Sequence, residues 1–176
     1  MGWSLSHLPL REPERLDAFF LAVGKSLYLS NSFEGKCGYL LQLIRFGNAL
    51  RDGNDFDAAN SILRAMKDKM LAATLSELRG SQPLEPEHFA TLESAKDARN
   101  FIAHEGASIG QVWSATAASL ELHTSRLRHE VCALALGDNL VSQWIYEIEE
   151  NEQAPFTIRN EYPRWVDEWV FGNLPL

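Results

Sequence analysis

Apolar side chains recur at three- and four-residue steps along most of this chain, and this period constrains the fold more than any other feature. Over residues 14–29 they form the stripe of an amphipathic helix. The polar cluster at 30–32 interrupts the stripe, and Asn31 followed by Glu34 resembles a helix cap with its capping box. A second helix is then expected up to about residue 50, although the phase also fits one long kinked helix.

The same period predicts three further helices in the middle of the chain. Glycine, proline and short polar residues mark their ends, because these residues favour helix caps and turns. The predicted helices run from Asn54 or Asp55 to Gly80, from Pro86 to about Glu105, and from about Ser108 to Leu136, with Gly137 directly behind the last one.

The pattern is weaker after Gly137. The β-branched and aromatic residues at 141–148 fit a short helix, and they equally fit a strand paired with residues 156–159. Further on, Trp165, Trp169 and Phe171 recur at helical spacing. Core packing or a dimer contact is the expected role of this aromatic stripe.

These elements define a fold class. A chain of 176 residues is long enough for one domain with a hydrophobic core. We predict an all-α protein, an antiparallel bundle of four to five core helices over residues 1–137. Residues 138–176 are expected to form a short C-terminal appendage packed on the same domain, with a small hairpin as one alternative. A bundle alone leaves function open, because unrelated activities share this architecture.

Charge and hydropathy exclude several classes of protein. The net charge of -8 and the pI near 5.1 argue against nonspecific nucleic-acid binding, which requires a basic surface. Apolar runs are too short to span a membrane, and the N-terminus lacks the basic stretch and apolar core of a secretory signal. We therefore expect a cytoplasmic protein without a membrane partner.

Metal and cofactor sites are not expected. Cys37 and Cys132 are far apart in the sequence, which predicts two reduced, buried thiols rather than a metal knuckle or a disulfide. The histidines do not fall at ligand spacing, and no Gly-rich phosphate loop is present.

The segment from Arg99 to His104 is the one chemically specific feature. Arg99 falls on the apolar stripe of its helix, where an arginine needs a partner or a cleft. Asn100 and His104 are four residues apart and therefore neighbours on an adjacent ridge. Arg99 and His104, five apart, are separated by about 140° around the axis. The two would converge only in a groove or with help from a second copy of the helix.

An arginine and a histidine brought together can cleave a phosphodiester through a ribose 2′-hydroxyl. Histidine takes and gives protons near neutral pH, and the arginine fork matches phosphate and stabilises developing negative charge. The structural alternative is that Arg99 pairs with a carboxylate such as Glu34 or Asp97, while His104 caps the helix C-terminus. Spacing alone favours this alternative.

The run from Ala98 to Glu105 closely resembles the signature of the HEPN superfamily, in which arginine and an adjacent polar residue precede a histidine near the end of a late helix. Residues from about 13 to 136 resemble the helical core of that family. The resemblance implies a metal-independent endoribonuclease with Arg99 and His104 as the catalytic pair and Asn100 in support. It also implies an RNA substrate, a homodimer whose two motifs line one cleft, and a role as a toxin with an antitoxin partner or as a phage-defence effector.

One position departs from the family pattern. HEPN toxins paired with a nucleotidyltransferase antitoxin carry a tyrosine two residues after the histidine, where this chain has Gly106. Regulation by modification at that position is therefore not expected here. A noncatalytic HEPN-like regulatory or protein-interaction module remains the alternative function, in keeping with the acidic charge and the aromatic C-terminus.

Overall fold

The computed structural model describes residues 13–53, 56–57, 60–61, 71–81, 85–108 and 116–172, and this part of the chain forms helices and no strands. The all-α fold class is thus confirmed. The helices are α1 (Pro13–Arg51), α3 (Leu71–Ser81), α4 (Pro86–His104), α5 (Ala117–Glu150) and α6 (Phe156–Phe171). Within the described residues, no helix is long and apolar enough to cross a membrane.

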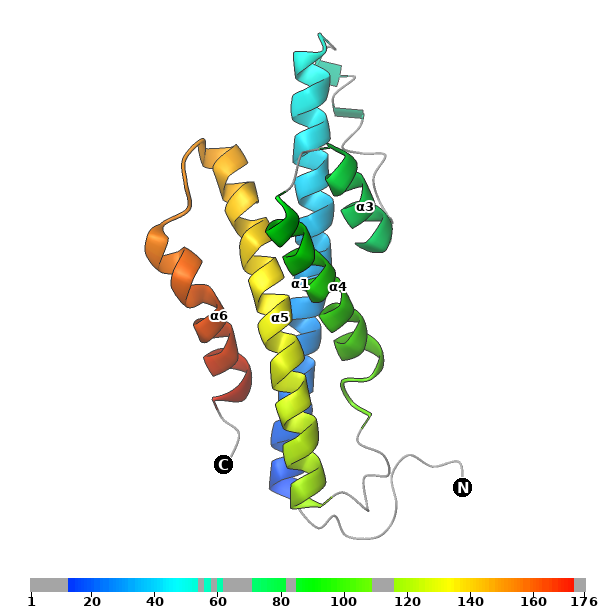
Figure 1. Cartoon of the computed structure of the whole chain (residues 1–176), viewed down its shortest axis with the longest axis vertical. Helices are drawn as coiled ribbons and strands as arrows, with labels where there is room; N and C mark the ends of the chain where they lie inside the picture. Colours follow the sequence, from blue (N-terminus) through cyan, green and yellow to red (C-terminus); the bar gives the residue numbers. More distant parts are fainter. Residues whose placement is uncertain are drawn as a thin grey trace.

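The two long helices α1 and α5 lie side by side and form the centre of the bundle (Figure 1). α4 packs on both of them, α3 contacts α1 and α4, and α6 lies along α5 on the side away from α3 and α4. The chain runs in the same direction through α1 and α5, whereas α4 and α6 run antiparallel to α5. Buried apolar residues from all five helices meet in one core.

α1 is a single helix of 39 residues, so the predicted break at 30–32 is wrong and the long-helix alternative is correct. Two buried serines explain why the polar residues do not end it. The Ser26 hydroxyl donates to the Ala22 carbonyl at 2.7 Å, and the Ser30 hydroxyl donates to the Ser26 carbonyl at 3.0 Å. Each hydroxyl is satisfied by its own helix, so it can face the core without interrupting the turns.

α5 also differs from its predicted bounds. It begins after Thr116, which forms a capping box with Ser119, and it continues past Gly137 to Glu150. Gly137 is buried where α4 approaches α5, and a Cβ added there would lie 2.3 Å from the Ala95 Cβ. This glycine therefore permits close helix packing rather than ending the helix. α5 begins at Ala117 and not near Ser108 as predicted, and residues 109–115 lie outside the described part.

α6 replaces the hairpin alternative, because residues 156–159 form its first turn and 141–148 belong to α5. Pro163 lies inside α6 and cannot donate to the Arg159 carbonyl one turn earlier. The side-chain amide of Asn139 on α5 donates to that carbonyl instead, at 2.7 Å. The helix therefore accommodates its proline by docking on α5.

The aromatic stripe predicted near the C-terminal end is only partly buried. Phe171 is buried as expected for core packing, whereas Trp165 and Trp169 are 40% and 46% exposed and contribute less to the core.

Cys37 is buried, but the expectation that Cys132 is buried is wrong. Cys132 shares the solvent-facing side of α5 with Leu136, one turn further on.

Candidate functional site

The segment from Arg99 to His104 occupies the C-terminal part of α4, at the predicted place. Pro86 stands at the start of this helix, and His104 is its last residue. Ala98 and Ile102 are buried and fix which side of the helix faces the core. On the outer side, Asn100 and His104 are exposed to solvent. Both side chains are therefore accessible to a ligand or to a second copy of the chain.

Arg99 points to the seam between α4 and α1, where it has two partners. Its Nη2 lies 2.5 Å from Glu34 Oε2, and its Nη1 donates to Asn100 Oδ1 at 3.3 Å. The arginine side chain is 22% exposed, and its Nε is buried without a hydrogen-bond partner among the described residues. The structural alternative from the sequence, an ion pair between Arg99 and Glu34, is thus present. Asp97 instead lies 3.7 Å from Lys96.

The structure does not bring Arg99 and His104 together within one chain. α4 is uninterrupted between them, so five residues separate the two side chains by about 140° around the axis and about 7.5 Å along it. Asn100 lies between them on the helix surface, and its hydrogen bond goes to Arg99. Within the described residues, no hydrogen bond joins Asn100 to His104. Arg99 and His104 therefore do not face one another across a site within this chain.

The end of α4 is held by α5. The amides of Glu105 and Gly106 both donate to the Phe101 carbonyl, at 2.7 and 2.9 Å, and close the last turn. The Arg126 guanidinium lies 4.2 Å from the centre of the Phe101 ring, and its Nη2 is 3.8 Å from Glu105 Oε2. A half-exposed cation from α5 thus lies beside the helix end that carries His104.

The sequence offers four basic residues that could compensate locally for the acidic net charge: Lys67, Lys69, Arg126 and Arg128. Arg128 forms a two-point ion pair with Asp167 on α6, at 2.7 and 2.9 Å. Lys67 and Lys69 lie outside the described residues. Of these four cations, only Arg126 is shown beside the C-terminal end of α4 within the described residues.

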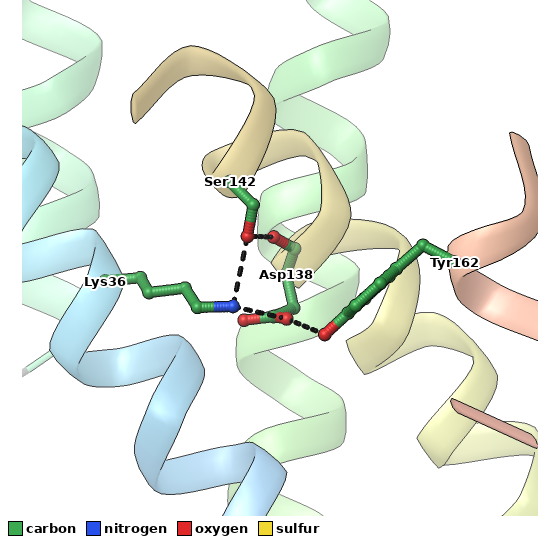
Figure 2. Close-up of polar contacts among 4 residues, drawn as sticks. All are labelled: Lys36, Asp138, Ser142 and Tyr162. Carbon is green, nitrogen blue, oxygen red and sulfur yellow. Dashed lines mark hydrogen bonds and ion pairs between the residues drawn. The ribbon is translucent and has the colours of Figure 1, made fainter. Parts of the chain in front are cut away.

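A second polar cluster lies at the junction of α1, α5 and α6 (Figure 2). Asp138 on α5 is fully buried, and its Oδ2 accepts from Lys36 Nζ at 2.8 Å and from the Tyr162 hydroxyl. Lys36 also donates to the Ser142 hydroxyl at 3.0 Å, which in turn donates to the Asp138 carbonyl at 2.7 Å. Asp138 Oδ1 has no hydrogen-bond partner among the described residues.

This cluster shifts the titration of two neighbouring groups. Burial raises the pKa of the Tyr162 phenol, and the charge of Asp138 raises it further. Burial likewise raises the pKa of the Cys37 thiol, with smaller contributions from Asp138 and Glu34. Both groups stay protonated at neutral pH, so neither supplies a nucleophile. The arrangement is that of a clamp that holds three helices together.

Sequence reasoning missed the Asp138 cluster. The expected helix end at Gly137 placed Asp138 in a connection, where an aspartate needs no explanation. A signal was nevertheless present, because an acidic residue within a continuous apolar stretch requires a partner when it is buried.

Comparisons with protein-family models, with curated proteins and with solved structures give no match for this chain. Among the described residues, no group of histidine, cysteine and carboxylate side chains is arranged to hold a metal ion.

Proposed function

We propose that this protein is a metal-independent endoribonuclease of the HEPN type that acts as a homodimer in the cytoplasm. The observation that carries the proposal is the placement of the motif in an all-α bundle: Asn100 and His104 are exposed near the C-terminal end of α4, and Arg99 lies beside them in the seam with α1. The lack of convergence within one chain agrees with a composite cleft, in which a second protomer supplies the missing half.

The proposed chemistry uses the ribose 2′-hydroxyl as nucleophile. Its oxygen attacks the adjacent phosphorus while the bond from phosphorus to the 5′-oxygen breaks, leaving a 2′,3′-cyclic phosphate and a 5′-hydroxyl. His104 either accepts the proton of the 2′-hydroxyl as general base or donates the proton that the 5′-oxygen takes up as general acid, and solvent water exchanges the other proton. Arg99 stabilises the charge that develops on the phosphoryl oxygens, and Asn100 holds the arginine through its amide oxygen. The nucleophile belongs to the substrate, so this reaction needs no metal-bound water.

The test is cleavage of single-stranded RNA in EDTA by the wild type, Arg99→Ala and His104→Ala. We expect a loss of at least about 100-fold for either variant, the range in which single acid–base and charge-stabilising groups act. Arg45→Ala and His129→Ala are matched controls, because Arg45 pairs with Glu77 away from the site and His129 is exposed on α5. Equal cleavage by the wild type and both site variants would refute the proposal.

The composite cleft has its own test. In a mixture of Arg99→Ala and His104→Ala proteins, a mixed dimer carries one intact Arg99 and one intact His104 on different protomers. We expect partial recovery of RNA cleavage after the two inactive variants are mixed and allowed to exchange subunits. No recovery, together with a monomeric mass by light scattering, would exclude the composite site.

A noncatalytic interaction module is the second candidate, and an aromatic surface favours it. Tyr28 on α1 and Trp169 on α6 are 69% and 46% exposed, and their rings meet edge to face at 6.1 Å. Exposed large aromatic side chains are typical of binding surfaces. Toxicity in cells that disappears with His104→Ala would exclude this second function.

A further inference from the structure

The contact between Glu34 and Arg99 bears directly on how the proposed site would bind its substrate. Glu34 comes from the middle of α1 and reaches across the seam to the arginine of α4. Its carboxylate is 31% exposed and the arginine side chain 22%, so the pair lies at the surface rather than in the core. A ligand from solvent can therefore compete for the same guanidinium.

Few donors of Arg99 remain for a phosphate while Glu34 is bound. Its two terminal nitrogens already contact Glu34 and Asn100, and the third nitrogen is buried. Bidentate recognition of phosphate requires two neighbouring N–H groups on one accessible edge of the guanidinium. One such edge of the guanidinium includes the buried Nε. The other edge pairs Nη1 with Nη2, and its Nη2 is the nitrogen that contacts Glu34.

The charges around the arginine point the same way. Lys96 lies one turn before Arg99, and it is bound to Glu93 and lies 3.7 Å from Asp97. Together with Glu34, three carboxylates thus surround two cations along this part of α4. The seam is not electropositive, although RNA binding depends on exposed positive charge.

We propose that the Glu34 carboxylate occupies the phosphate-binding position of Arg99, and that an RNA phosphodiester must displace it before the arginine can engage. Glu34 thus acts as an internal competitor that keeps the arginine neutralised until substrate arrives. A phosphodiester and a carboxylate each carry one negative charge and accept from the same guanidinium N–H groups, so the two compete for Arg99. The inference rests on the proposed function in taking RNA as the ligand of Arg99.

The test measures binding rather than cleavage. The probe is a fluorescein-labelled, mixed-sequence single-stranded oligoribonucleotide with 2′-O-methyl riboses, which has no free 2′-hydroxyl and stays intact. We expect Glu34→Gln to bind it about two- to fivefold more tightly than the wild type by fluorescence anisotropy, the gain that release from a partly exposed ion pair supports. The gain should disappear in the double variant Glu34→Gln/Arg99→Ala compared with Arg99→Ala alone.

Glu77→Gln is the matched control. Glu77 contacts Arg45 across α1 and α3, and the two ion pairs have similar exposure. Each substitution removes one negative charge from the protein, so a gain caused by net charge alone would appear in both variants. We expect Glu77→Gln to bind the oligonucleotide as the wild type does. Equal affinities for Glu34→Gln and Glu77→Gln, or a gain that persists without Arg99, would overturn the inference.

Failure of this inference is distinguishable from failure of the proposed function. Tighter, Arg99-dependent binding by Glu34→Gln without cleavage of ordinary RNA in EDTA would leave the inference standing and refute the ribonuclease. Cleavage by the wild type, with no Arg99-dependent gain in Glu34→Gln, would retain the ribonuclease and refute the competition. Thermal unfolding of each variant verifies that the bundle is intact in both measurements.

Discussion

Replacement of Lys36 by methionine is expected to destabilise the bundle strongly, although the lysine lies near the surface. The side chain of Lys36 is 32% exposed, whereas its partner Asp138 is fully buried. Methionine preserves the aliphatic stem and removes the ammonium group that lies 2.8 Å from the carboxylate. Among the described residues, Asp138 would then have only Tyr162 as a side-chain hydrogen-bond donor to its buried carboxylate.

The magnitude follows from the cost of an unpaired buried charge. Removing one partner of a buried ion pair costs about 3–5 kcal/mol. The lower end applies here, about 3 kcal/mol, because the Tyr162 hydroxyl still donates to the carboxylate. For a chain of this length, that loss lowers the melting temperature by about 6–12 °C. Thermal unfolding followed by circular dichroism and urea denaturation measures it.

Two variants make this prediction refutable. Lys25→Met removes another lysine of α1, whose ammonium donates to the Trp169 carbonyl at an exposed position, and should cost less than about 1 kcal/mol. The double variant Lys36→Met/Asp138→Asn also removes the buried carboxylate that has lost its ion-pair partner, so it should recover part of the lost stability. Equal melting temperatures for Lys36→Met and Lys25→Met, or strictly additive losses in the double variant, would contradict the reasoning.

Three further predictions concern packing and titration. Gly137→Ala should lower the free energy of unfolding, measured by urea denaturation, by about 1–3 kcal/mol, because the added methyl overlaps α4. Gly24→Ala, which has open space around it, should raise that free energy by about 0.5–1 kcal/mol, and equal effects of the two variants would contradict the close approach of α4 to α5. Because burial raises the pKa of Tyr162 in the folded state, the stability that its protonated phenol provides is complete below about pH 10 and declines above that pH. Tyr162→Phe should therefore lose less stability than the wild type as the pH rises above about 10, and parallel losses would contradict this prediction. Alkylation of the native protein should modify Cys132 and spare Cys37 until urea unfolds the chain, as peptide mass spectrometry can show; rapid native modification of both would disagree with the structure.

The proposed site was largely predictable because its residues lie within one helix. Proline at residue 86 and the apolar period before residue 104 predict the helix, and the residue spacing alone places Arg99 and His104 on different sides of it. Glu34 was among the partners expected for Arg99, since an arginine on an apolar stripe needs a carboxylate. The sequence offered Asp97 equally, and the contact between α1 and α4 decided between them.

The errors share a different cause. Local rules interpret residues 30–32 and Gly137 as helix ends. In the structure the Ser30 hydroxyl donates to a carbonyl of its own helix, and Gly137 lies against Ala95 of α4. A glycine that ends a helix and a glycine that admits a neighbouring helix look the same in one sequence. The clamp formed by Lys36, Asp138 and Tyr162 escaped prediction because its members are separated by 102 and 24 residues.

The sequence by itself determined that this chain is helical, roughly where most of its helices lie, and that Arg99 and His104 face different directions on one of them. These properties depend on backbone hydrogen bonds and side-chain spacing within a few turns. Only the tertiary structure decided which side chains meet across helices, including Glu34 with Arg99 and Lys36 with Asp138. Such contacts depend on the rotation and offset of packed helices, which the close packing of the whole core determines.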